Sequence, residues 1–248
     1  MAWRCSGKTN IELVDNLIKA KMLQISNEAS LLRISQAMKA VDRAHYVRNE
    51  ADAYFDSPQS IGHGATISAP HMHAYAVDHL LPFLRPGSRV LDVGSGSGYL
   101  AAVLHHLVST YAASGPEDQS GTAVVPGKVV GIEHIPELVT WSLDNLKKDE
   151  RTRRAVENKD IEVYAGDGRL GYPSEGPYDA IHVGAAAPTI PQPLIDQLAS
   201  PGRMFIPVGT LSQHIYQVDK DAQGKVTETQ IMAVNYVPLT DRDKQKAA

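Results

Sequence analysis

The stretch RVLDVGSGSGYLAAVLHHLV, residues 89–108, constrains the fold of this 248-residue chain more than any other. Its first five residues are a short apolar run typical of a buried strand, and its last ten have a helical pattern. Three alternating glycines lie between them and allow the backbone to approach a ligand closely. A strand, a glycine turn and a helix in this order indicate the first unit of an α/β sheet.

The same alternation continues toward the C-terminus. Apolar, strand-like runs occupy residues 128–133, 161–165, 178–184 and 203–208, and helical patterns at 136–148 and 191–198 separate some of them. Strands that alternate with helices predict a parallel sheet with right-handed crossovers. The runs HIYQVDK and TQIMAVNYVPL flank DAQG, so a hairpin should finish the sheet. The polar stretch at residues 109–127 is expected to be a disordered loop.

Upstream of the glycine turn the pattern is helical. Thr9 and Glu12 have the spacing of a capping box, and further helices are expected at residues 28–41 and 70–84, with a loop between them. We expect one catalytic domain over residues 1–248, with an N-terminal helical region (9–87) and an α/β core (88–248). Tyr46 is expected at the surface.

Composition excludes several classes of protein. The net charge of −4 argues against a nucleic-acid partner. The single cysteine, Cys5, rules out an internal disulfide framework and a thiolate zinc cluster. No apolar segment reads as a signal peptide or a membrane span. We therefore expect a soluble, cytoplasmic protein with no nucleic-acid or membrane partner. A monomer is expected as well, although the sequence does not determine the oligomeric state.

The glycine loop carries clues to its ligand. Its spacing is G-x-G-x-G rather than the G-x-G-x-x-G of pyrophosphate sites, and Asp92 precedes it, where an ammonium group is favoured over a phosphate. Glu133 ends the second strand, where a carboxylate can accept bonds from ribose hydroxyls. Asp167 follows the third strand and could accept the adenine amino group. Together these features predict S-adenosylmethionine as the ligand.

Other interpretations stay open at this point. The glycines can form a tight turn without a ligand, Glu133 can be a solvated strand end, and Asp167 can be a turn residue in Asp-Gly. A nicotinamide oxidoreductase shares the fold, although the glycine spacing and Asp92 count against it. A non-catalytic adaptor is the alternative from another class.

Residues 56–76, DSPQSIGHGATISAPHMHAYA, form an unusual stretch. On its own, Ser68 just before Pro70 is better explained as a helix cap than as a catalytic group. His63, His71 and His73 raise the idea of a metal, but their spacing suits one poorly, so no metal is predicted.

Several segments resemble one family, the protein-L-isoaspartate(D-aspartate) O-methyltransferases. The segments are DSPQSIGHGATISAPHMHAYA, LDVGSGSGYL, GDGR, PYDAIHVGAAAP and YVPLTDRDKQ. The resemblance implies a class I methyltransferase (Rossmann-like) fold, with a seven-stranded, mostly parallel sheet, an antiparallel last strand and N-terminal helices. It also implies S-adenosyl-L-methionine as methyl donor and isoaspartyl residues of damaged proteins as acceptor.

The resemblance assigns roles to individual residues. It implies that Ser68 is the active-site serine, in place of a simple cap, and that residues 65–67 line both the donor and the acceptor sites. The implied donor site consists of Asp92, Gly94, Ser95, Gly96, Ser97, Glu133, His134, Asp167, Gly168, Thr240 and Gln245. The implied acceptor site consists of Ala65, Thr66, Ile67, His73, Val183, Gly184 and Ala185. Ser68 and the glycine loop, both present, favour an enzyme over an adaptor.

The chain departs from the family pattern in three places. Glu133 stands where animal members have Asp, and either carboxylate can hold a ribose. Residues 62–64 read Gly-His-Gly where Gly-Phe-Gln is expected, which affects the predicted peptide groove. The insert at residues 109–126 is longer than usual and has no assigned role.

Overall fold

The computed structural model describes residues 5–21, 28–109, 125–241, 243 and 245. Within that part of the chain the main sheet has seven strands: β3 (Arg89–Val93), β4 (Lys128–Glu133), β5 (Ile161–Ala165), β6 (Tyr178–Val183), β7 (Leu198–Val208), β8 (Gln213–Lys220) and β9 (Val226–Val234). Most of the insert at 109–126 lies outside the described residues.

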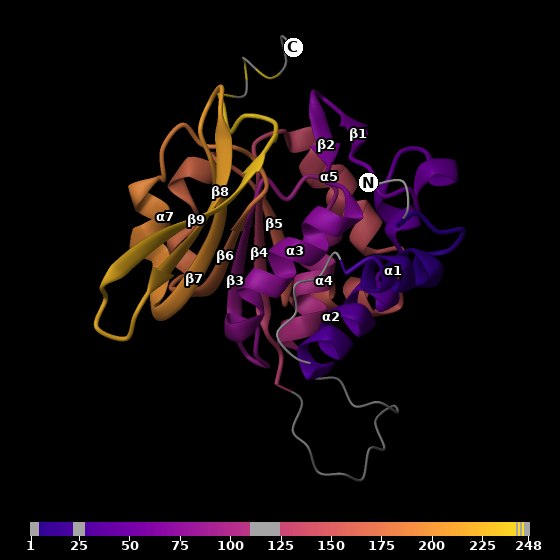
Figure 1. Ribbon diagram of the computed structural model, residues 1–248, viewed down its shortest axis with the longest axis horizontal. Helices are drawn as coiled ribbons and strands as arrows, with labels where there is room; N and C mark the ends of the chain where they lie inside the picture. Colours follow the sequence, from indigo (N-terminus) through magenta and orange to yellow (C-terminus); the bar gives the residue numbers. More distant parts are fainter. Residues whose placement is uncertain (1–4, 22–27, 110–124, 242, 244, 246–248) are drawn as a thin grey trace.

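The strand order is β5-β4-β3-β6-β7-β8-β9 (Figure 1). All pairings from β5 to β7 are parallel, and the pairings β7–β8 and β8–β9 are antiparallel. The predicted fold class is confirmed. Because two antiparallel pairings follow each other, β8 runs against the other strands and β9 turns back to their direction.

Helices cover both faces of this sheet. They are α1 (Asn10–Lys19), α2 (Glu28–Ala40), α3 (Pro70–Leu80), α4 (Tyr99–Val108), α5 (Pro136–Leu146), α6 (Glu150–Glu157) and α7 (Gln192–Gln197). Short 3-10 turns are η2 (Arg43–Tyr46), η3 (Glu50–Asp52), η4 (Leu81–Phe83), η5 (Gly168–Leu170) and η6 (Pro173–Glu175). The predicted helices are present, whereas α6 was not predicted because its charged sequence, ERTRRAVE, has no apolar stripe.

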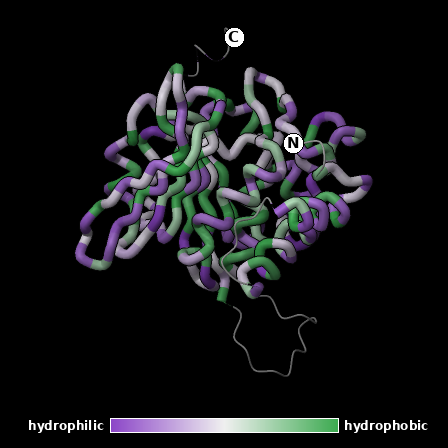
Figure 2. Tube along the Cα trace, viewed as in Figure 1, coloured by the Kyte–Doolittle hydropathy of each residue, from purple (hydrophilic) through white to green (hydrophobic). Residues whose placement is uncertain are grey.

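Alternate strand residues belong to two apolar clusters. Val90 packs with the helices α1–α5, whereas its neighbour Leu91 packs with residues around α7. Both faces of the central strands are therefore buried, which explains why their sequences are continuous apolar runs. Figure 2 shows this hydrophobic centre and the more hydrophilic outer hairpin of β8 and β9.

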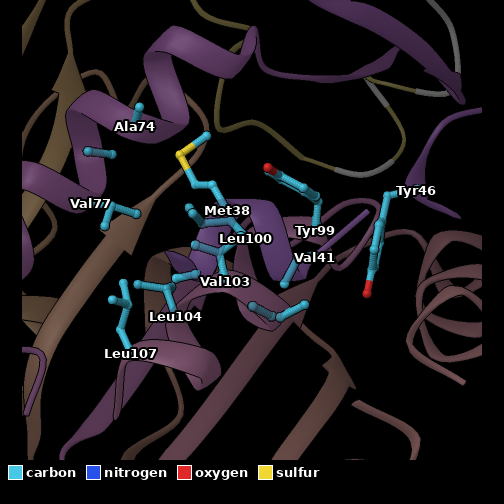
Figure 3. Packing of buried hydrophobic residues seen from close by; sticks show 14 of the residues in the cluster. Met38, Val41, Tyr46, Ala74, Val77, Tyr99, Leu100, Val103, Leu104 and Leu107 are labelled. Carbon is cyan, nitrogen blue, oxygen red and sulfur yellow. The ribbon is translucent and has the colours of Figure 1, made fainter. Parts of the chain in front are cut away.

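The larger cluster joins the N-terminal helices to the sheet (Figure 3). Met38 of α2, Val77 of α3 and Leu104 of α4 are all buried within it. Tyr46 was wrongly expected at the surface: it is 1 % exposed, and its ring meets that of Tyr99 edge-on at 5.6 Å. A phenol offers a large apolar body, which periodicity arguments for short segments overlook.

A second, small sheet precedes α3. Strands β1 (Gln59–Gly62) and β2 (Ala65–Ile67) form an antiparallel hairpin where the sequence indicated only a loop. Its turn is the unusual Gly-His-Gly, in which Gly62, His63 and Gly64 all have positive φ (88°, 55° and 68°). Two of the three positions carry glycine, which adopts this backbone conformation without strain.

Candidate active site

The carboxyl ends of the parallel strands form the site. The chain proceeds from β3 outward to β5 on one side and then continues at β6 on the other side of β3. The loops after β3 and β6 therefore leave in opposite directions and open a crevice, the usual ligand site of open α/β sheets. Two hollows share this crevice, and both are lined by Thr66, Gly94, Gly96 and Gly184.

The glycine loop needs its glycines for two reasons. Gly94, Gly96 and Gly98 all have positive φ, which side chains disfavour. There is also little room for a side chain at Gly96: a Cβ there would lie 3.2 Å from Cδ1 of Ile61 in the β1–β2 hairpin. Gly98 is the N-cap of α4 and has no side chain to satisfy the first N–H groups of that helix.

The first hollow, of about 550 Å³, extends from this loop across the ends of β4 and β5. Glu133 ends β4 and is 5 % exposed, and its carboxylate accepts the N–H groups of Ile135 (3.0 Å) and Gly96 (3.2 Å). Burial raises the pKa of Glu133, and these hydrogen bonds oppose the rise. The second lone pairs of its oxygens can accept hydroxyl groups.

Asp167 lies at the far end of this hollow. Its carboxylate accepts the backbone N–H of Arg169 (3.0 Å) and the Nη2 group of the same residue (2.7 Å). The side-chain hydrogen bond from Arg169 is the main cause that lowers the pKa of Asp167, so this carboxylate stays ionised. Gly168 is equally constrained, because a Cβ there would meet Val93 at 2.4 Å.

Gln245 closes the same hollow from the C-terminal segment. Its Oε1 lies 2.5 Å from Nε2 of His134, and its Nε2 donates to the carbonyl of His63 at 3.0 Å. One side chain thus connects the residue after β4 to the turn of the β1–β2 hairpin. Thr240 lines the wall beside it.

The second hollow lies between the glycine loop and α3 and is rich in buried polar groups. Asp92 and His182 face each other in the register of β3 and β6, and Asp92 Oδ1 lies 2.8 Å from His182 Nδ1. Asp92 Oδ2 and Ser95 Oγ are buried and have no hydrogen-bond partner among the described residues. Because buried polar atoms are normally paired, these two atoms indicate a polar ligand here.

Ser68 is in the wall of this second hollow. The structure shows that it does not cap α3: the N-cap is Ala69, and that position makes no side-chain cap hydrogen bond. The Ser68 carbonyl accepts Nη2 of Arg43 at 2.9 Å. Burial raises the pKa of Tyr236 to about 12, and an interaction with the Ser68 hydroxyl opposes that rise, so Tyr236 is protonated and close to this serine.

A third depression, a groove of about 1,030 Å³, lies beside the crevice. Thr66 and Ser68 are common to the groove and the second hollow. Residues 232–237 also line the groove; they are the end of the edge strand β9 and the residues that follow it. An extended peptide in this groove would therefore have Ser68 in the wall beside it.

Sequence comparison decides the family. The pattern of the family described as protein-L-isoaspartate(D-aspartate) O-methyltransferase (PCMT) matches residues 8–244.

The chain belongs to this family.

Individual relatives agree with the PCMT pattern. A Triticum aestivum protein-L-isoaspartate O-methyltransferase is 48% identical over 215 residues, 86% of each chain. A Caenorhabditis elegans protein of the same name is 43% identical over 247 residues and covers 99% of this chain and 98% of its own. A solved Plasmodium falciparum chain, described as a candidate member and bound to S-adenosyl-L-homocysteine, superposes with a TM-score of 0.77 at 30% identity, covering 94% of this chain and 99% of that one.

The structure of this PCMT member brings most of the predicted site residues together. The predicted donor residues all line the first or the second hollow. Of the predicted acceptor residues, Ala65, Thr66, Ile67, His73, Gly184 and Ala185 line them too. Val183 does not: it is fully buried in the cluster around α7, because its side chain points to the other face of β6.

Several residues that line or support the site were not predicted from the sequence, among them His182, Met232 and Tyr236 in its walls and Arg43 behind the wall. His182 had a usable signal, since a polar residue inside the apolar strand YDAIHV needs a buried partner. Arg43, Met232 and Tyr236 had none, because they reach the site only through tertiary packing. Among the described residues no group of three or more His, Cys, Asp or Glu side chains could hold a metal ion.

Proposed function

We propose that the chain transfers a methyl group from S-adenosyl-L-methionine to the free α-carboxylate of L-isoaspartyl residues in proteins and peptides, and to the β-carboxylate of D-aspartyl residues. One observation carries the proposal: Thr66 and Ser68 form a wall that the donor crevice and the peptide groove have in common. A donor and a protein acceptor can meet only at such a place.

The residues of the crevice fit the donor. The unpaired Asp92 Oδ2 suits an ammonium group, Glu133 suits ribose hydroxyls, and Asp167 suits the adenine amino group. When bound, S-adenosyl-L-methionine supplies a methyl group on a positively charged sulfur. No helix among the described residues is long and apolar enough to cross a membrane.

Ser68 orients the acceptor. A carboxylate is ionised at neutral pH, so no general base is needed, and catalysis depends on placement and exclusion of water. The Ser68 hydroxyl can donate to one oxygen of that carboxylate and leave the other free to attack. Tyr236, as a protonated phenol beside Ser68, supplies a second donor at the same wall.

The groove distinguishes isoaspartate from aspartate by geometry. In an isoaspartyl residue the chain continues through the side-chain carbonyl, so the free carboxylate is attached directly to Cα. A groove that holds an extended chain can place that carboxylate over Ser68 and misplace the longer one of normal Asp. A misplacement of about 1 Å can cost on the order of 10²-fold in rate. The backbone nitrogen of the next residue then attacks the ester carbonyl and expels methanol, which forms a succinimide without the enzyme. Hydrolysis of this ring returns some normal aspartate.

We further propose that residues 1–248 work as one catalytic domain, as a cytoplasmic monomer. The large apolar cluster, which contains side chains of both the N-terminal helices and the sheet, supports the single domain. Cys5 is a buried free thiol, which suits a reducing compartment. Light scattering of the purified protein tests the oligomeric state.

The test of activity uses two peptides that are identical except for one Asp or isoAsp linkage, with radiolabelled donor. We expect base-labile methyl ester on the isoaspartyl peptide only, followed by partial recovery of the normal peptide over hours at neutral pH. Equal labelling of both peptides, or label that survives mild base, would refute the proposed acceptor.

A further inference from the structure

Arg43 is a buried cation behind the active-site wall. It is the first residue of η2, its side chain is fully buried, and it forms no ion pair with any residue that the structure describes. Its Nε also has no hydrogen-bond partner there. The buried carboxylate of Asp56 attracts this guanidinium without forming an ion pair with it, and so offsets part of the cost of burying the charge; the direct contacts of the side chain must offset the rest.

The direct contacts of the Arg43 side chain all lead to the site. Nη2 donates to the carbonyl of Ser68 at 2.9 Å, and Nη1 lies 3.5 Å from Nδ1 of His73. The guanidinium carbon lies 5.4 Å from the ring centre of Tyr99, which supports the group from the side of α4. The rigid guanidinium group of Arg43 therefore contacts both Ser68, which precedes α3, and His73 in the first turn of α3.

The contact with His73 determines which ring nitrogen carries the proton. A guanidinium has only donors, so Nδ1 of His73 must accept and carry no proton. Burial and then the charge of Arg43 lower the pKa of His73 well below its ordinary value, and the nearby His182 and His71 act in the same direction. The ring of Tyr99 packs against it at 5.0 Å. The contact and the lowered pKa both favour a neutral His73 with its proton on Nε2.

We propose that Arg43 is a positioning residue of the methyl transfer: it holds the Ser68 segment in place and fixes His73 as the Nε2–H tautomer, a neutral hydrogen-bond donor in the wall of the second hollow. Arg43 itself lines neither hollow nor the groove. The inference rests on the proposed function for its kinetic consequence, but the state of His73 can be measured without any turnover.

The experiment compares Arg43→Gln and Arg43→Lys with Arg33→Gln. Arg33 is a matched control, since it also donates to backbone carbonyls, Leu84 (2.5 Å) and Leu107 (3.3 Å), but away from the site. We expect kcat for the isoaspartyl peptide to fall about 10- to 100-fold in Arg43→Gln, the loss of one or two charge-assisted hydrogen bonds. Arg43→Lys keeps the charge and should lose less, and Arg33→Gln should lose none per folded molecule.

NMR of the imidazole nitrogens supplies the second measurement. In the unaltered protein Nδ1 of His73 should carry no proton across the neutral pH range. In Arg43→Gln, or in Arg43→Lys if the former does not fold, we expect a mixture of tautomers and a higher pKa for His73. Unchanged nitrogen signals in a folded variant, or a kcat loss no larger than that of Arg33→Gln, would overturn the proposal. If the unaltered protein methylates no isoaspartyl peptide, the proposed function fails while the NMR result still tests Arg43.

Discussion

At the scale of single residues, the position of Ser68 relative to α3 decides between a helix cap and an active-site serine. From the sequence alone a serine before Pro70 is best explained as a helix cap, but α3 begins one residue later than a Ser68 cap requires. Its side chain is therefore free for another role, its carbonyl is held by Arg43, and Tyr236 lies close to its hydroxyl. Local capping rules could not distinguish these cases, because the deciding partners come from residues far away in the chain.

We predict that Ser68→Ala lowers kcat/KM for isoaspartyl peptide roughly 10- to 100-fold, because a hydrogen bond to a charged group contributes about 1.5–3 kcal/mol. The free energy of unfolding should hardly change. The control is Thr9→Ala, which removes a genuine cap, since Thr9 Oγ1 accepts the N–H of Glu12 at 3.2 Å. That variant should lose about 1 kcal/mol of stability and no activity. The opposite pattern, with Ser68→Ala unstable but fully active, would restore the capping interpretation.

Among the secondary-structure elements, the β1–β2 hairpin connects the parts of the site. It carries Ala65, Thr66 and Ile67, and Ile61 approaches the glycine loop. Arg48 connects the hairpin to α5: its Nε donates to the carbonyl of Ile61 at 3.2 Å, and its guanidinium lies 3.8 Å from the ring centre of Trp141.

We predict that Arg48→Ala loosens this hairpin and weakens donor binding roughly 3- to 10-fold, since a cation–π contact contributes about 0.5–1 kcal/mol at an exposed site and the hydrogen bond about as much. Calorimetry measures the donor affinity, and hydrogen exchange of residues 59–67 should accelerate. Arg85→Ala serves as control, because Arg85 Nε donates only to the nearby carbonyl of Pro82 at 3.2 Å. Unchanged exchange in Arg48→Ala would mean that other contacts hold the hairpin.

For the chain as a whole, the sequence was most informative where regular patterns are long. The strands β3 to β8 and the helices α3, α4 and α5 follow from apolar runs and turns. The glycine loop, Glu133 and Asp167 could be assigned to one edge, because parallel strands bring their carboxyl ends together. Other features could not be predicted, because they depend on tertiary contacts that leave no periodic signal in the sequence. They are the hairpin turn at Gly-His-Gly, the charged helix α6, and the positions of Arg43 and Tyr236 beside the site.

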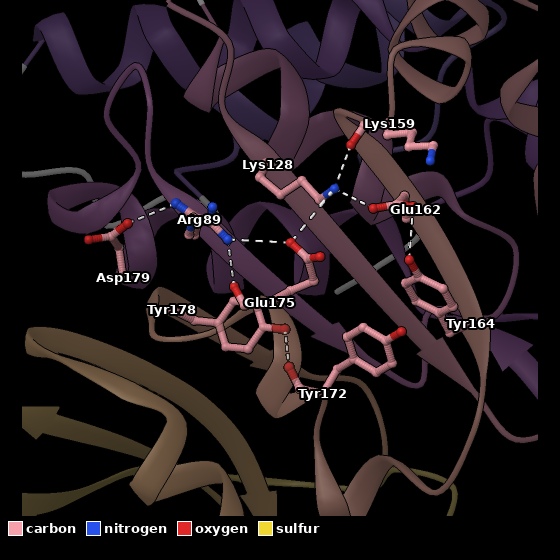
Figure 4. Close-up of polar contacts among 9 residues, drawn as sticks. All are labelled: Arg89, Lys128, Lys159, Glu162, Tyr164, Tyr172, Glu175, Tyr178 and Asp179. Carbon is pink, nitrogen blue, oxygen red and sulfur yellow. Dashed lines mark hydrogen bonds and ion pairs between the residues drawn. The ribbon is translucent and has the colours of Figure 1, made fainter.

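The amino edge of the same sheet carries a separate network (Figure 4). Lys128 donates to the carbonyl of Lys159 at 2.7 Å and to the Glu162 carboxylate, and it lies 3.8 Å from Glu175. Arg89 donates to the carbonyl of Glu175 at 2.8 Å. These contacts connect the beginnings of β3, β4 and β5 on the side away from the glycine loop. The edge with the network should therefore serve stability, and the edge with the loops should serve chemistry.

The variant Lys128→Met tests this division. We expect this variant to lose about 1–2 kcal/mol of unfolding free energy, measured with urea at neutral pH, because the Lys128 pairs are intermediate between exposed and fully buried ion pairs. Its kcat/KM should not change. Lys147→Met is the control, because Lys147 makes only an exposed contact with Asp144 at 3.9 Å and its loss should stay within about 0.5 kcal/mol. A fall in kcat/KM of folded Lys128→Met would contradict the separation of the two edges.

The pH dependence of this variant follows from Glu162. Burial raises the pKa of Glu162, but the hydrogen bonds from Lys128 and Tyr164 outweigh burial and leave that pKa below its ordinary value. A carboxyl with a lowered pKa in the folded state stabilises it above the unfolded pKa, about 4.3, and this contribution is lost as the pH falls through the folded pKa. The difference in unfolding free energy between the unaltered protein and Lys128→Met should therefore be largest at neutral pH and shrink below about pH 4. A difference that stays constant over this range would mean that Lys128 acts mainly through the carbonyl of Lys159 and not through the carboxylate.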